Sequence, residues 1–288
     1  MSSNNQKSSY YFVSPYLIFI IILVIYPILI TLSLAAVSGN RLIFLHNYKD
    51  IFGEMYFSRV LINTIIWTAS SVIIIVLINI FLALLLNQNF AGRNVFRIII
   101  LVLPWATPDI VAAVSWKWMY NSMYGLINNV LLQFKFPISQ IDWLGAPNLA
   151  LFSVILANIW KGYPIGTMIM LAAYQTIHPE IYEAAEIDGC TGLRSLFRIT
   201  LPIIRSTLFS LLLISVIWTI NYFPLIYIMT GGGPAHRTDT LVTIAYRESF
   251  TFLNFNKGSG IILLVFAVTC VFAFLYIKVL LGNGEKQD

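Results

Sequence analysis

The side chains that could carry out chemistry are few, and they are scattered along the chain. The histidines, His46, His178 and His236, lie in three different polar segments, and Cys190 and Cys270 are far apart. Metal sites need such ligands at short spacings, and a disulfide framework needs several cysteines. No motif that pairs a nucleophile with a base is present either. The sequence therefore predicts no metal centre and no catalytic site, and we expect that the chain is not an enzyme.

A glycine-rich segment, Gly231-Gly232-Gly233-Pro234, is the candidate for nucleotide binding. The loop that cradles ATP phosphates requires Gly-Lys followed by Ser or Thr after its first glycine. This segment lacks both the lysine and the hydroxyl residue. We therefore expect no cofactor in this chain, and any energy for transport must come from another subunit or from an ion gradient.

Polar side chains inside apolar runs are the remaining candidates. Asp109 and Lys161 each lie near the middle of a long apolar run, where an ionisable residue is costly and usually functional. They could form an ion pair or a polar route for a solute, or each could face a partner subunit or a water-filled crevice. Asn221 and Tyr222 lie in another such run, and an amide beside an aromatic ring suits a sugar. Aromatic residues also gather at membrane interfaces, so packing alone is the alternative for Tyr222.

The elements that must position these residues are membrane-spanning helices. Only 10% of the residues are charged and 59% are hydrophobic, whereas soluble domains average about 25% charged residues. A helix needs about 20 apolar residues to cross the bilayer core. Six runs meet that requirement, and they predict an all-α membrane protein with a single transmembrane domain over residues 1–288. The predicted spans are residues 16–37, 60–86, 98–119, 149–171, 203–229 and 261–281.

Prolines lie close to the charged residues within these spans. Pro104, Pro108 and Pro164 are expected to bend or break the third and fourth spans, because proline cannot donate a helical hydrogen bond. Transporters often have broken helices at their binding sites. Because consecutive spans are antiparallel, Asp109 and Lys161 could lie at a similar depth. The sequence therefore predicts a polar site beside a helix break.

The segment of residues 175–202, between the fourth and fifth spans, has a pattern of its own. Pro179 suits the first position of a helix, and Glu180 and Glu183 would lie in its first turn. Gly189 suits a left-handed helix stop. An amphipathic stretch follows and ends near Pro202. We expect a helix–turn–helix at the membrane surface, which could be either a docking element or an ordinary amphipathic hairpin.

This segment resembles the EAA loop of permeases of binding-protein-dependent ABC importers. The matching residues are Glu183-Ala184-Ala185-Glu186-Ile187-Asp188-Gly189 and Ile199-Thr200-Leu201-Pro202. Thr230 to Pro234, followed by Thr240-Leu241-Val242-Thr243, resembles the carbohydrate branch of that family, which includes maltose-like and glycerol 3-phosphate-like systems. The resemblance implies a type I ABC importer permease fold of six helices with a cytoplasmic coupling helix in the loop.

The resemblance also implies residue roles and partners. Residues Glu183, Ala184, Ala185, Asp188 and Gly189 would couple the permease to an ATP-binding subunit dimer, which would bind ATP and Mg. A second, homologous permease and an extracellular substrate-binding protein would complete the importer, surrounded by membrane lipid. The chain would be a multi-pass protein of the cytoplasmic membrane that translocates a sugar or related solute.

The orientation follows from the cytoplasmic loop, which would put both termini in the cytoplasm. Basic residues divide equally between the two sides, so the positive-inside rule does not decide the orientation. The compact loop with Arg93 and Arg97 favours the same arrangement.

Two other classes of protein remain to be weighed. A secondary transporter or channel that works alone is the alternative, although such transporters commonly carry internal repeats and none is visible here. Scattered basic residues do not form the patch that nucleic acid requires, so we expect no nucleic-acid partner.

Overall fold

The computed structural model describes residues 13–38, 41–42, 44–134 and 140–284. Within them, five helices are long and apolar enough to cross a membrane, and a bent pair of helices forms a sixth span. This confirms the predicted all-α fold with six spans. The spans are Val13–Ala36, Phe57–Asn87, Arg93–Ala106 with Asp109–Met119, Ala150–Gln175, Arg205–Thr230 and Phe255–Val279.

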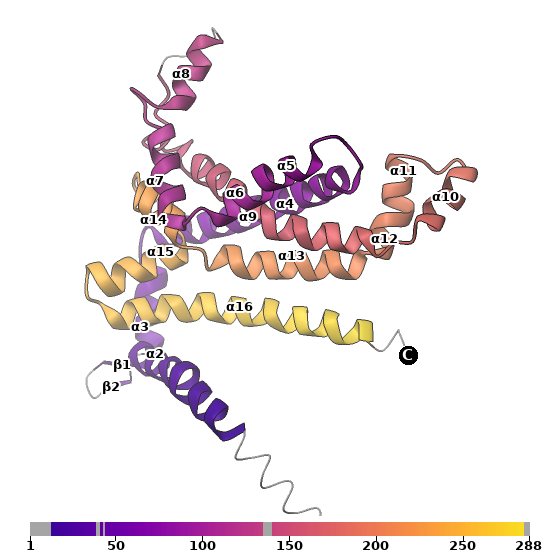
Figure 1. Ribbon diagram of the computed structural model, residues 1–288. Coiled ribbons are helices and arrows are strands. Elements are labelled where there is room, and N and C mark those ends of the chain that lie inside the picture. The colour runs from indigo at the N-terminus through magenta and orange to yellow at the C-terminus, as the bar shows by residue number, and fades with distance from the viewer. Residues whose placement is uncertain (1–12, 39–40, 43, 135–139, 285–288) are drawn as a thin grey trace, which may run out of the picture. The chain divides into compact units, whose positions relative to one another are not determined.

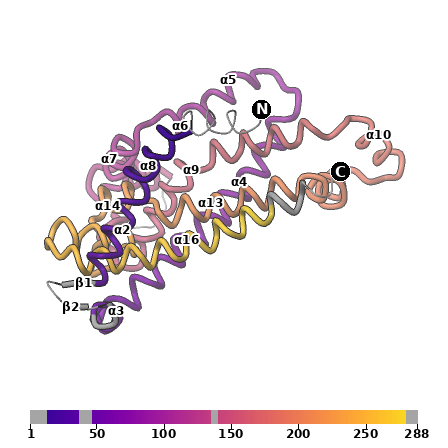
Figure 2. Tube along the Cα trace, turned by 90° about the horizontal axis from the view of Figure 1, so that it is seen from below, coloured from indigo at the N-terminus to yellow at the C-terminus, as the bar shows by residue number. Residues whose placement is uncertain are grey.

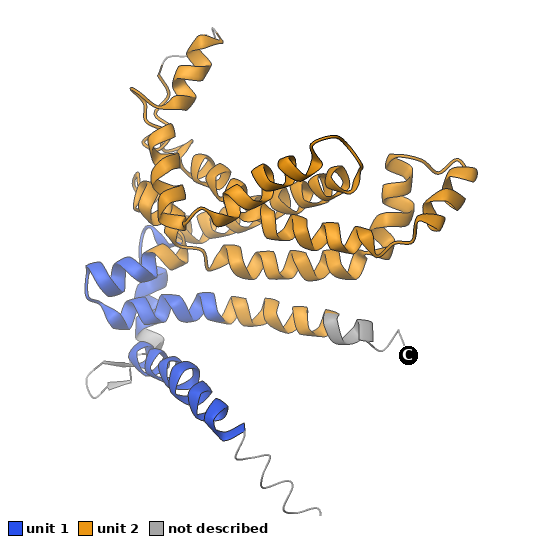
Figure 3. Ribbon diagram, in the orientation of Figure 1, with its two compact units in different colours: residues 1–57, 244–266 blue, residues 58–243, 267–288 orange. Residues whose placement is uncertain are grey.

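Each observed span overlaps a predicted one, and the boundaries differ most at the last, which begins at Phe255 instead of residue 261. The ends of the chain, which we expect in the cytoplasm, lie outside the described residues. The chain folds into two compact units, described one at a time below (Figure 3). That the chain functions as one permease domain remains a prediction.

The larger unit holds residues 58–243 and 267–288. Its core is built from apolar side chains of α4, α7, α9 and α14, among them Trp67, Val154 and Leu225, which are fully buried. The Trp67 indole also donates a 3.0 Å hydrogen bond to the Thr219 carbonyl, which joins α4 to the end of α13. Its helices are α4 (Phe57–Asn87), α5 (Arg93–Arg97), α6 (Leu103–Ala106), α7 (Asp109–Met119), α8 (Leu126–Gln133), α9 (Ala150–Gln175), α10 (Pro179–Ile187), α11 (Leu193–Ser195), α12 (Leu201–Ile203), α13 (Arg205–Ile220) and α14 (Pro224–Thr230).

The long helices α9 and α13 lie side by side in this unit, and α10 lies at the far end of α9 from α7 and α8 (Figures 1 and 2). Two π-helical turns, Ile98–Val102 and Leu196–Thr200, extend α5 and α11. The fifth span is interrupted between α13 and α14, where proline starts the second helix at Pro224.

The third span breaks at Thr107 and Pro108, where the two helical parts are bent by 103°. Thr107 has an extended backbone (ψ 122°), as expected for a residue that precedes proline. Pro108 has no N–H to donate to the carbonyl of Pro104, so that carbonyl loses its helical partner. The predicted break is therefore present at Pro108, whereas α9 continues without interruption through Pro164.

The smaller unit holds residues 1–57 and 244–266. It contains a first apolar helix that ends in α2 (Tyr26–Ala36), a two-residue antiparallel pair of β1 (Val37–Ser38) and β2 (Arg41–Leu42), and α3 (Phe44–Gly53). It also contains the end of α15 (Leu241–Tyr246), a π-helical turn (Arg247–Thr251) and the first part of α16 (Phe255–Gly284).

Polar contacts at the ends of the helices hold this unit together. The Lys257 ammonium lies 2.6 Å from Glu54 Oε1 and 3.0 Å from Glu248 Oε1. The Tyr56 hydroxyl donates to Glu248 at 3.0 Å, and burial raises the pKa of this hydroxyl, so it remains a donor at neutral pH. Asn47 donates to the carbonyls of Ala35 and Asn256. These bonds tie α2, α3 and the start of α16 to one another.

Candidate functional site

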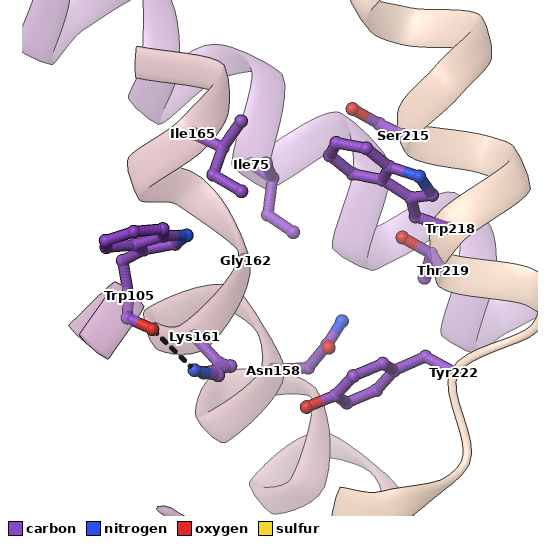
Figure 4. A pocket seen from close by; sticks show the side chains of 10 residues that line it. All are labelled: Ile75, Trp105, Asn158, Lys161, Gly162, Ile165, Ser215, Trp218, Thr219 and Tyr222. Atoms are coloured by element: carbon purple, nitrogen blue, oxygen red, sulfur yellow. Dashed lines mark hydrogen bonds between the residues drawn. The ribbon is translucent and has the colours of Figure 1, made fainter. Parts of the chain in front are cut away.

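A cavity of about 300 Å³ lies between α9 and α13 in the larger unit (Figure 4). We call it the central cavity. Trp105, Trp218 and Tyr222 supply aromatic surface, and Asn158, Ser215 and Thr219 supply polar groups without charge. The cavity is lined by Ile75, Trp105, Asn158, Lys161, Gly162, Ile165, Ser215, Trp218, Thr219 and Tyr222.

Two matching stripes of residues form most of this lining. On α9 the lining residues are 158, 161, 162 and 165, and on the fifth span they are 215, 218, 219 and 222. Both sets follow the spacing i, i+3, i+4, i+7, which places residues on one face of a helix. The two helices therefore turn equivalent faces toward the same cavity.

Lys161 holds the broken third span in place. Its ammonium group donates to the carbonyls of Pro104 at 3.1 Å, Trp105 at 3.2 Å and Thr107 at 2.5 Å. These carbonyls lie at the C-terminal end of a helical segment, where partners are missing and a cation is favoured by the helix dipole. Lys161 thus replaces the hydrogen bonds that the break removes.

Asp109 lies on the other side of the same break, in the first turn of α7. One of its carboxylate oxygens is 3.6 Å from the Lys161 nitrogen, so the ion pair proposed from the sequence is present. The Lys161 side chain is 14% exposed and that of Asp109 is 41% exposed. A carboxylate in a first helical turn is favoured by the dipole. The two charges therefore stabilise the two helix ends that meet at the break.

Two neutral polar groups are buried in the central cavity. Among the described residues, the Asn158 amide nitrogen makes no hydrogen bond. The Tyr222 hydroxyl interacts with the Asp109 carboxylate, which places it beside the break. In Figure 4, Asn158 lies between Lys161 and Tyr222. Buried polar atoms are normally satisfied, so the Asn158 amide nitrogen is available to a ligand.

The residues predicted from the sequence divide between the cavity and its surroundings. Lys161 and Tyr222 line the cavity, and Asp109 contacts Lys161. Asn221 does not line it, because its amide donates to the Ile217 carbonyl at 2.8 Å and the Thr269 hydroxyl at 3.1 Å. Among the lining residues not predicted from the sequence are Trp105 and three polar residues, Asn158, Ser215 and Thr219. Helical spacing from Lys161 and Tyr222 could have found the three polar ones.

The glycine-rich segment after α14 packs around a buried carboxylate. Asp239 is completely buried and accepts hydrogen bonds from the Thr243 hydroxyl at 3.0 Å, and its other oxygen is 2.8 Å from the His236 ring. Gly232 has a positive φ of 89°, and a Cβ atom there would collide with the Asp239 carboxylate. The segment is therefore packed closely around the Asp239 carboxylate.

The segment between α9 and α13 forms the expected helix–turn–helix. Pro179 is the first residue of α10, and Glu180 lies in its first turn. Gly189 has a φ of +72°, and its N–H bonds the Glu186 carbonyl at 3.0 Å while the Cys190 N–H bonds the Ala185 carbonyl at 2.8 Å. These two bonds define a Schellman motif. Gly189 is thus the left-handed stop that the sequence predicts.

Residues 179–200, which we call the coupling hairpin after its likeness to the EAA loop, expose several large apolar side chains. Ile187 is 89% exposed, Leu193 74% and Phe197 65%. Glu183, Ala184 and Asp188 are also exposed, whereas Ala185 is buried against its own chain. Apolar side chains this exposed at the end of a domain are typical of a surface that binds another protein.

Comparison with known proteins agrees with this architecture. Residues 56–283 match the family described as binding-protein-dependent transport system inner membrane component. The chain is 32% identical over 279 residues to the trehalose/maltose transport system permease protein MalF of Thermococcus litoralis, covering 95% of this chain and 93% of the relative. It is 30% identical over 274 residues to the sulfoquinovosyl glycerol transport system permease protein SmoG of Agrobacterium fabrum, covering 93% and 88%.

A solved structure has the same fold. It is a bacterial ABC transporter involved in the import of the acidic polysaccharide alginate, and one of its chains matches with a TM-score of 0.84 and 24% sequence identity. The match covers 96% of this chain and 95% of that chain.

Proposed function

This chain belongs to the family of inner membrane components of binding-protein-dependent transport systems, and from that membership we propose that it moves a saccharide or related solute through the central cavity. It is a multi-pass permease subunit of an importer. Relatives are named for trehalose and maltose and for sulfoquinovosyl glycerol. Membership in this family argues against a secondary transporter or channel that works alone.

The observation that carries the saccharide proposal is the chemistry of the central cavity. Sugars present an apolar ring face and many hydroxyl groups. The cavity offers aromatic surface from Trp105 and Trp218, an unpartnered amide nitrogen on Asn158 and the hydroxyl of Tyr222. Its volume of about 300 Å³ is at the lower end of ordinary ligand sites.

We propose that the coupling hairpin docks on an ATP-binding subunit dimer that holds ATP and Mg. The support is its exposed apolar residues and its rigid Gly189 stop, together with the sequence likeness to the EAA loop. In this proposal Glu183, Ala184 and Asp188 face the partner, and Ala185 and Gly189 fix the shape of the hairpin.

The remaining partners follow from the same proposal. A second permease subunit would cover apolar side chains of the first span, which are exposed between Val13 and Ala36. A substrate-binding protein would deliver the solute to the permease. It would do so on the side of the membrane opposite the coupling hairpin. Both termini would then lie in the cytoplasm.

The experiment is uptake of labelled maltose and trehalose by proteoliposomes that contain the assembled importer and its binding protein. We expect ATP-dependent uptake of at least one sugar. Asn158→Leu and Tyr222→Phe should each reduce uptake about 5- to 13-fold, because each removes a hydrogen bond to the solute worth about 1–1.5 kcal/mol. The complex should still assemble.

Tyr174→Phe is the matched control. It also removes a buried hydroxyl from the larger unit, but this hydroxyl bonds the Ile80 carbonyl at 3.3 Å and does not line the cavity. Uptake should change little. If all three variants reduce uptake equally, the cavity is not the route of the solute.

A further inference from the structure

We propose that the central cavity accepts uncharged saccharides and rejects anionic ones, such as sugar phosphates and uronates. This inference rests on the proposed function and specifies its substrate class. Membership in the family does not decide the point, because a structural neighbour takes part in the import of an acidic polysaccharide. Among the described lining residues, a single side chain is charged, and its hydrogen bonds limit what it can offer a ligand.

Of the described residues that line the cavity, Lys161 alone carries a charge. An ammonium group has three N–H donors and no acceptor. Three carbonyls, those of Pro104, Trp105 and Thr107, lie within 3.2 Å of the Lys161 nitrogen. All three donors are therefore committed to the backbone. A phosphate or carboxylate would have to displace a bond that holds the broken span.

The charge of Lys161 is also balanced within the protein. The Asp109 carboxylate lies 3.6 Å from the ammonium nitrogen. The C-terminal end of the Arg93–Ala106 helix adds a partial negative charge at the same place, and the N-terminal end of α7 adds a partial positive one at Asp109. The sum around the break is close to zero. An anion in the cavity would lose its water without gaining a countercharge, which is costly.

The neutral polar groups of the cavity suit hydroxyl ligands. The Asn158 amide nitrogen can donate to a sugar oxygen, and the Tyr222 hydroxyl can donate or accept. Neither group neutralises a full charge. Site residues that bind anions well are arginine, lysine and backbone N–H groups at a helix start. The stripes on α9 and the fifth span present side chains into the cavity and no helix start.

The test compares matched compounds on the assembled complex of this chain, its second permease and its ATPase in nanodiscs. The binding protein is left out, so its own specificity does not enter. Tryptophan fluorescence is recorded during titration, because Trp105 and Trp218 line the cavity. The pairs are trehalose with trehalose 6-phosphate, and methyl glucoside with methyl glucuronide. We expect the neutral member of each pair to bind at least 10-fold more tightly.

A variant that adds an unbalanced cation tests the cause. Asn158→Lys places an ammonium group at the cavity wall away from the three carbonyls, and it should bring anion binding to within about 2-fold of neutral binding or reverse the preference. Asn158→Gln keeps an amide and should retain the neutral preference.

Three results would count against the inference. Equal or tighter binding of the anionic members by the unaltered complex overturns the charge selectivity and leaves the saccharide route intact. An assembled Asn158→Lys complex that still rejects anions overturns the electrostatic explanation. Binding of none of the four compounds overturns the inference and the proposed saccharide route together. If Asn158→Lys does not assemble, the comparison of matched compounds on the unaltered complex still decides.

Discussion

Replacing Lys161 with methionine should destabilise the protein far more than replacing Asp109 with asparagine. Methionine keeps most of the side-chain volume but removes the donor that bonds three carbonyls. The bond to the Trp105 carbonyl is exposed in the isolated chain. The bonds to Pro104 and Thr107 are partly buried. A buried acceptor left without a donor costs about 1–3 kcal/mol, so the expected loss is roughly 2–6 kcal/mol.

Asp109→Asn should cost much less. Its nearest carboxylate oxygen is 3.6 Å from the Lys161 nitrogen, beyond the usual hydrogen-bond distance. We therefore expect this contact to contribute less than the three carbonyl bonds, about 1 kcal/mol or less. From the sequence alone we expect the double variant to recover part of the loss, because both charges leave together. The structure changes that expectation, because the carbonyls remain unpartnered in the double variant. The coupling energy between the two sites should therefore stay at or below about 1 kcal/mol.

The assay is a double-mutant cycle on unfolding free energies, measured by titration with sodium dodecyl sulfate in mixed micelles. Lys161→Arg is the control, since arginine keeps several N–H donors near the carbonyls and should restore part of the stability. If the double variant is as stable as Asp109→Asn alone, Lys161 acts through the carboxylate and not through the carbonyls. That outcome would refute the reasoning.

Three further predictions concern the hairpin, the glycine loop and the orientation. Gly189→Val should lower substrate-stimulated ATP hydrolysis by the assembled importer at least several-fold. A φ of +72° costs an ordinary residue roughly 1–2 kcal/mol of conformational energy, and it costs a β-branched residue more. Normal stimulation would show that Gly189 is not part of the coupling element. Gly232→Ala should lower the melting temperature of the complex, because the new Cβ atom would collide with the Asp239 carboxylate. Gly53→Ala is the control and should leave the melting temperature unchanged, because a Cβ atom there meets open space. Single cysteines at Ala184 and Pro234, in a chain freed of its native cysteines, should react with an impermeant maleimide from opposite sides of the membrane; labelling of both from one side would contradict the topology.

Much of the fold could be predicted because the bilayer imposes a simple rule on composition. Long apolar runs identified every span, and Pro108 identified the break in the third one. Gly189 was predictable as a helix stop because few other residues adopt its backbone conformation. Pro164 was not predictable in the same way. It lies inside α9, where neighbouring helices can stabilise a proline that would break an isolated helix.

The candidate site was only partly predictable. Charge made Asp109 and Lys161 conspicuous, and their pairing followed from the antiparallel order of the spans. The three carbonyls that accept hydrogen bonds from Lys161 belong to the backbone. Every residue has a backbone carbonyl, so the residue types could not identify these three. Asn158 was missed because it is an ordinary amide, although it lies one helical turn before Lys161. The helical spacing of polar residues around Lys161 and Tyr222 would have predicted more of the cavity lining than charge alone did.

The exposed apolar side chains of the coupling hairpin also bear on how the cell must make this protein. Ile187, Leu193 and Phe197 are exposed in the isolated chain, and apolar surface that no partner covers favours aggregation and recognition by proteases. Synthesis of the chain must therefore be matched to that of its partner subunits. We expect a copy made in excess to be degraded quickly, so that the number of complete importers is set by the scarcest subunit.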